Sequence, residues 1–105
     1  MRFLPLALLL LPALASAAPD GRGIVLHGNA NGALPCAACH GINGAGNPAT
    51  GAPALAGLPE TQITAALAAM AEGKSGTPLM QSIAAALSPA EAQAVALYFA
   101  GLPKP

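Results

Sequence analysis

The sequence has no tryptophan, and aromatic side chains make up only 3% of its 105 residues. Charged side chains are scarce as well, at 8%, and the four basic and four acidic ones cancel. The chain has no run of basic residues that could contact a phosphate backbone, which argues against nucleic acid as a partner. The chain also has few large side chains with which to fill a core. Because small domains of this kind commonly need a staple, a metal or a cofactor, we expect one here.

The first 17 residues have the pattern of a secretory signal peptide. Arg2 supplies a positive charge, residues 3–15 are almost wholly apolar, and Ala15-Ser16-Ala17 offers a small-x-small cleavage site. The apolar stretch contains two prolines and is shorter than the ~20 residues that a membrane-spanning helix needs. We therefore predict a signal peptide over residues 1–17 with cleavage after Ala17, and one exported domain over residues 18–105 with no membrane span.

The only two cysteines stand three positions apart, in Cys36-Ala37-Ala38-Cys39-His40. This C-x-x-C-H spacing is typical of c-type haem attachment, because two such thiols can each add to a vinyl group on one porphyrin edge. A haem-free dithiol or zinc module is the competing interpretation. It lacks a neighbouring βαβ pattern, and its ligands would be cramped by their adjacency in sequence. We predict Cys36 and Cys39 as covalent anchors and His40 as an iron ligand of one haem c.

Helical patterns occur in several places, and no stretch alternates with a period of two, so an all-α fold without a sheet is predicted. Asp20 can cap the first helix, and Ser88 with Glu91 forms a capping box before the last one. Gly73 and Gly101 are placed to end the helices before them. We expect helices over residues 21–27, 58–72 and 89–100, one helical turn at the cysteine motif, and loops over residues 28–32 and 41–57.

A second axial ligand could come from His27, Met70 or Met80. Met70 shares an apolar helix face with Ile63 and Leu67, where a methionine is more often a core residue. His27 precedes Cys36 by only nine residues, so its loop would have to pass around the haem. Met80 lies outside a helical pattern, where a loop could present its thioether to a metal. Ligand chemistry favours Met80 and leaves Met70, His27 and an open site as alternatives.

The mature chain resembles a class I cytochrome c of the small bacterial periplasmic type, which occurs singly or as tandem two-haem proteins. The resemblance implies a small cytochrome c fold, with three to five short helices wrapped around one haem, and it implies Met80 as the distal ligand. It is carried over nearly the whole mature region by Cys36-Ala37-Ala38-Cys39-His40-Gly41, Pro53-Ala54-Leu55-Ala56-Gly57, Met80-Gln81-Ser82-Ile83-Ala84-Ala85-Ala86-Leu87-Ser88 and Ala96-Leu97-Tyr98-Phe99.

The same resemblance implies roles for other residues. The carbonyl of Pro53 would accept a hydrogen bond from His40 and so fix its ring. Leu55 would pack against the haem. Gly23 and Tyr98 would lie where the first and last helices cross, with the glycine allowing close approach.

A His/Met haem keeps small ligands off the iron, and a thioether ligand raises the reduction potential. We therefore predict a periplasmic electron carrier, not an enzyme, that serves a redox protein donor and a redox protein acceptor. Two alternatives remain. The chain could be the small cytochrome subunit of a larger periplasmic oxidoreductase, such as a dehydrogenase or terminal oxidase, or a haem protein with an open iron that binds small ligands.

Overall fold

The structure, a computed structural model, describes residues 18–105, so the predicted signal peptide at residues 1–17 lies outside the described residues. Over residues 18–105 an isolated bridge between Asn47 and Ala52 is the sole β pairing. The all-α prediction is confirmed. The helices are α1 (Gly21–His27), α2 (Ala37–His40), α3 (Glu60–Ala71), α4 (Pro78–Ala85) and α5 (Pro89–Ala100).

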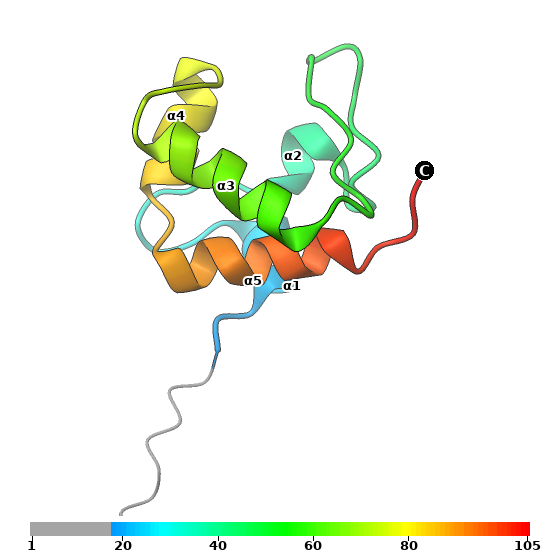
Figure 1. Cartoon of the computed structure of the whole chain (residues 1–105), viewed down its shortest axis with the longest axis horizontal. Coiled ribbons are helices and arrows are strands. Elements are labelled where there is room, and N and C mark those ends of the chain that lie inside the picture. The colour runs from blue at the N-terminus through cyan, green and yellow to red at the C-terminus, as the bar shows by residue number, and fades with distance from the viewer. Residues whose placement is uncertain (1–17) are drawn as a thin grey trace, which may run out of the picture.

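Helix α5 is the base on which the other elements are arranged (Figure 1). It packs against α1 on one side and α3 on the other, while α3 also contacts α4 and α1 also contacts α2. Phe99 of α5 and Val25 of α1 are fully buried at this junction. Figure 1 shows α4 and α2 on opposite sides above α5, with α3 running across the front between them. The packed core therefore holds α4 and α2 apart on a common base.

The close approach of α1 to α5 depends on Gly21, and the expectation for Gly23 was wrong. A β-carbon at Gly21 would lie 2.2 Å from the carbonyl oxygen of Ala94 in α5, so only glycine fits. A β-carbon at Gly23 would meet the side chain of Asp20 instead, which can move. The prediction chose the wrong face of α1, because the face that so short a helix turns toward its partner is set by packing against that partner.

The two glycines give a matched test of this crossing. We expect Gly21→Ala to lower the free energy of unfolding by about 1–3 kcal/mol, the usual penalty of overpacking. Gly23→Ala removes a flexible residue from a helix interior and is expected to leave stability unchanged or raise it by up to ~1 kcal/mol. Thermal unfolding of the two purified variants measures the difference. Equal effects would contradict the assignment of the contact to Gly21.

The last helix starts as predicted, whereas the first and third helices start differently in part. Ser88 and Glu91 form the predicted capping box. Asp20 is the N-cap residue of α1, but its side chain makes no capping hydrogen bond. Helix α3 begins at Glu60, two residues after the predicted start.

The described chain has no single helix long and apolar enough to cross a membrane, although α4 and α5 together meet the same length and composition test as a pair bent by 115°.

Candidate haem-binding site

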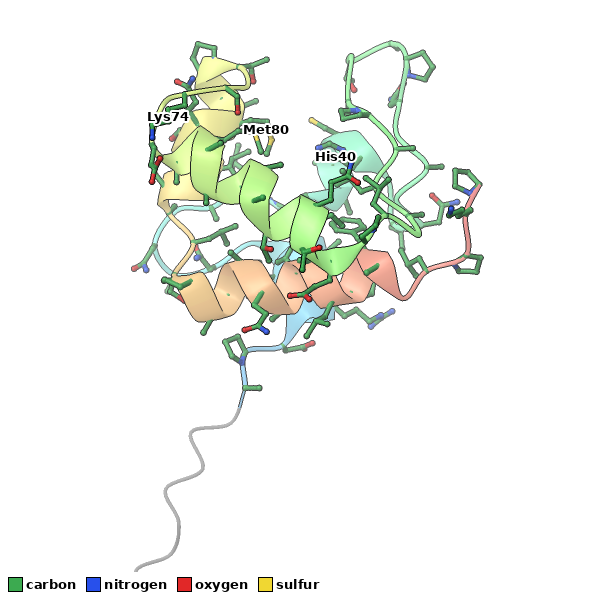
Figure 2. The ribbon with its side chains drawn as sticks, in the orientation of Figure 1. His40, Lys74 and Met80 are labelled. Atoms are coloured by element: carbon green, nitrogen blue, oxygen red, sulfur yellow. The ribbon has the colours of Figure 1, made fainter. Side chains whose placement is uncertain are left out.

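A cavity of about 650 Å³ opens among α2, α3, α4 and the loop at residues 41–57. None of the described residues that line it is Lys, Arg, Asp or Glu, and most of its wall is apolar. Figure 2 shows His40 of α2 and Met80 of α4 on facing sides of this space. The structure brings together all six residues that were predicted for the site, namely Cys36, Cys39, His40, Pro53, Leu55 and Met80.

His40 is held in one orientation on the α2 side of the cavity. Its side chain is buried, with a relative exposure of 6%, and its Nδ1 lies 2.9 Å from the carbonyl oxygen of Pro53. Because that oxygen can only accept, Nδ1 must carry the proton, which leaves Nε2 as the ring nitrogen with a free lone pair. This is the arrangement by which proteins orient a metal-binding histidine.

Both cysteines lie on the same side of the cavity as His40. Cys36 is the N-cap of α2 and Cys39 is within its single turn, and both thiols are free of disulfide bonds. Burial raises the pKa of the Cys36 thiol, against a weaker opposing effect of a backbone hydrogen bond. Cys36 and Cys39 thus line the same cavity as His40.

Met80 is in the first turn of α4, so its predicted place outside a helix was wrong. Thr77 caps this helix, with its Oγ1 accepting a hydrogen bond from the Met80 backbone N–H at 3.1 Å, and Pro78 follows at the first helical position. A Thr-Pro pair is a known helix-start signal, and Leu79, Met80 and Ile83 follow it at helical spacing, so the sequence did carry a signal for this helix. The start of α4 presents Met80 to the cavity opposite His40.

The other two ligand candidates are placed less favourably. Met70 also lines the cavity, but its Sδ packs against Gly76, where a β-carbon would be only 2.6 Å away. His27 is the last residue of α1 and does not line the cavity. Lys74, also labelled in Figure 2, was not a predicted ligand; it is exposed and forms an ion pair with Glu72 at 2.9 Å. Met80 is therefore the candidate that faces His40.

Gly46 is a residue of the site that the sequence reasoning missed. Its backbone N–H donates to the carbonyl of His40 at 2.9 Å, and its φ is +79°. A β-carbon there would lie 2.7 Å from the carbonyl oxygen of Ala52 and 2.8 Å from the carbonyl carbon of Pro53. Gly46 thus lets the two arms of the 41–57 loop close on each other and sets where the Pro53 carbonyl meets His40. In the sequence, Gly46 is one of several glycines in that loop, and nothing distinguishes it from the others.

The donor set and the walls fit a covalently held porphyrin. The volume is that of an ordinary cofactor site, the walls are apolar, two thiols lie along one edge, and a nitrogen and a thioether face each other. The fold and the site together define a small α-helical haem-binding protein.

The comparison with protein families makes the class specific. The chain belongs to the cytochrome c family, whose model matches residues 28–103. Membership, with the Cys36–Cys39 pair, implies a covalently bound haem c. The matched region is therefore a cytochrome c domain, a module that carries electrons.

Known relatives narrow the likeness further. The chain is 43% identical over 97 residues to a protein named thiosulfate dehydrogenase electron acceptor from Stutzerimonas stutzeri (strain A1501), covering 91% of this chain and 45% of that one. It is 44% identical over 70 residues to a protein of the same name from Thiomonas intermedia (strain K12), covering 67% and 32%.

Solved structures agree with this placement. Reduced cytochrome c4 from Pseudomonas stutzeri matches with a TM-score of 0.74 and 31% identity, over 82% of this chain and 48% of that one. A thiosulfate dehydrogenase from Marichromatium purpuratum matches with a TM-score of 0.77 and 32% identity, over 81% and 18%. The chain spans less than half the length of each of these four proteins.

The loop glycines provide a second matched prediction. Gly46 and Gly51 both have positive φ, but a β-carbon at Gly51 would meet nothing within 4 Å. We expect Gly51→Ala to cost roughly 1–2 kcal/mol of stability through backbone strain alone. Gly46→Ala should cost about 1–3 kcal/mol more, through overpacking, and should also shift the reduction potential by moving the Pro53 carbonyl. Denaturant unfolding and redox titration of the holoproteins measure both effects. A potential that changes equally in the two variants would contradict the role given to Gly46.

Proposed function

We propose that the chain is an exported, one-haem electron carrier of the periplasm, with residues 1–17 removed as a signal peptide and residues 18–105 forming a single domain. The pattern of the leader supports export. In an oxidising compartment two closely spaced cysteines would form a disulfide unless another group binds them, and a covalent haem is such a group.

In this proposal Cys36 and Cys39 would hold the haem covalently, and His40 and Met80 would be the ligands of its iron. The observation that carries it is the placement of His40 and Met80 on facing sides of one apolar cavity whose edge holds both thiols. A c-type haem bound there would supply a one-electron iron(III)/iron(II) couple. The chain itself orients His40 through Pro53, and it packs Leu55 against the space the ring would fill.

The same residues account for a carrier rather than a ligand binder. With Met80 on the iron, no coordination position is left for a small ligand. A neutral thioether also favours the reduced iron, which raises the potential. The uncharged lining of the cavity adds no carboxylate to favour the oxidised form.

The proposed electron donor is a thiosulfate dehydrogenase, because two relatives are named as electron acceptors of that enzyme. Leu34 and Leu79, each 52% exposed, line the mouth of the cavity and offer an apolar contact for it. Redox encounters of this kind commonly use small interfaces. The test mixes the oxidised holoprotein with a thiosulfate dehydrogenase and thiosulfate and follows its reduction by visible absorbance. Reduction at the rate seen without the enzyme would sink the assignment of this donor.

A second candidate is a fixed subunit of a larger oxidoreductase. It is favoured by one observation: the similar region in the Marichromatium structure occupies only 18% of a longer chain that is itself named a thiosulfate dehydrogenase. Purification of the tagged protein from its native cells at high salt separates the two cases. A stable complex supports the subunit, and recovery of the cytochrome alone supports the diffusing carrier.

A further inference from the structure

The side chain of Asn29 makes four hydrogen bonds. Its Oδ1 accepts from the backbone N–H groups of Asn31 and Ala33, at 3.0 and 2.9 Å. Its Nδ2 donates to the carbonyl oxygen of Ala86 at 2.8 Å and to Oε1 of Glu91 at 3.1 Å. Two partners are donors and two are acceptors, so the orientation of the amide is fixed and its full capacity is used.

These four bonds join two parts of the chain that are far apart in sequence. Asn31 and Ala33 belong to the loop that leads into Cys36, seven residues after Asn29. Ala86 is the C-cap of α4, the helix that carries Met80, and Glu91 belongs to the first turn of α5. The side chain of Asn29 thus ties the segment before the cysteine motif to the far end of the Met80 helix.

Helix α4 is anchored by its buried residues Ile83 and Ala84, and Asn29 adds a restraint at its C-terminal end. Its helix packing is against α3, which lies on the other side of the base from α1. The terminal carbonyl of a helix lacks an intrahelical partner, and the Asn29 amide supplies one for Ala86. Glu91 is a firm acceptor, because hydrogen bonds, chiefly from the Ser88 backbone N–H and also from Asn29, lower the pKa of its carboxyl.

We propose that Asn29 is a positioning residue that sets the distance between the two halves of the haem site and so holds Met80 in place opposite His40. The inference rests on the proposed His/Met ligation. A methionine–iron bond is weak enough that an outside ligand can compete with it, and it persists only where the protein holds the thioether close. Loss of the tether lets α4 shift outward, which weakens Met80 as a competitor for the iron.

The test uses Asn29→Asp, which keeps an oxygen for Asn31 and Ala33 but turns the donor toward Ala86 and Glu91 into a second acceptor. Ser88→Ala is the matched control, because it removes a helix cap beside the tether while leaving both Nδ2 contacts. Oxidised holoproteins are titrated with imidazole, and the sulfur-to-iron charge-transfer band is followed. We expect Asn29→Asp to bind imidazole on the order of tenfold more tightly than the wild type, and Ser88→Ala to bind it as the wild type does.

The outcomes are distinct. If Asn29→Asp loses stability as Ser88→Ala does but binds imidazole like the wild type, the positioning role is overturned. If the wild type itself shows no charge-transfer band, the proposed Met80 ligation fails first. Should Asn29→Asp yield no holoprotein, Asn29→Ala breaks the same tether without adding a charge beside Glu91, and the same tighter imidazole binding is expected of it.

Discussion

Replacing Met80 by alanine is expected to abolish the sulfur-to-iron charge-transfer band of the oxidised protein. It should also lower the reduction potential by on the order of 0.1 V or more, within the ~0.8 V range that axial ligands span. The reason is that Met80 is the thioether placed opposite His40. Visible spectroscopy and a redox titration measure both quantities, and rapid carbon monoxide binding by the reduced variant would report the opened position.

Met70→Ala is the control for this experiment. Met70 lines the same cavity, but its sulfur packs against Gly76. We expect that variant to keep the charge-transfer band and to lose about 2 kcal/mol of stability, the lower end for a buried methionine, because Met70 is only partly buried. Loss of the band in Met70→Ala and its survival in Met80→Ala would reverse the ligand assignment.

Replacing both Cys36 and Cys39 by alanine is expected to eliminate haem that survives extraction with acid and acetone. The larger effect should be on folding. Without the haem, the apolar wall of the cavity of about 650 Å³ would face water. A small domain that depends on a cofactor then loses much of its apolar burial. We therefore expect the double variant to accumulate poorly and to lack cooperative unfolding, as measured by mass spectrometry and circular dichroism.

Ala38→Ser provides the comparison within the same motif. Ala38 is exposed and lies between the two cysteines, so its replacement alters the motif without removing an anchor. That variant should carry one haem and unfold like the wild type. A double cysteine variant that still retained acid-resistant haem would contradict covalent attachment at these positions.

The parts of the fold that could be predicted are those fixed by local chemistry. The Ser88 capping box and the glycine that follows α3 act within a few residues, so they can be read directly. The cysteine motif is equally local. Helix α4 was missed for a different reason: it has only eight residues, which is too short for periodicity to establish a helix, and its Thr77-Pro78 start was assigned to a turn.

The rest depends on partners that are distant in sequence. Gly21 rather than Gly23 meets α5 because the rotation of α1 is set by packing. Asn29 looked like an ordinary turn residue, and its partners Ala86 and Glu91 lie 57 and 62 positions away. Gly46 gained its importance only from the opposing arm of its own loop. No local pattern identifies such long-range contacts.

The apolar mouth of the cavity has a consequence for the conditions under which the carrier works. Leu34 and Leu79 are exposed there, and no charged residue of the described chain lines the cavity. Dissolved salt screens the electrostatic attraction between charged partners, but it has little effect on an apolar contact. Apolar contacts weaken on cooling instead. The meeting of this cytochrome with its partner is thus expected to follow the temperature of the surroundings and to be nearly indifferent to their salinity.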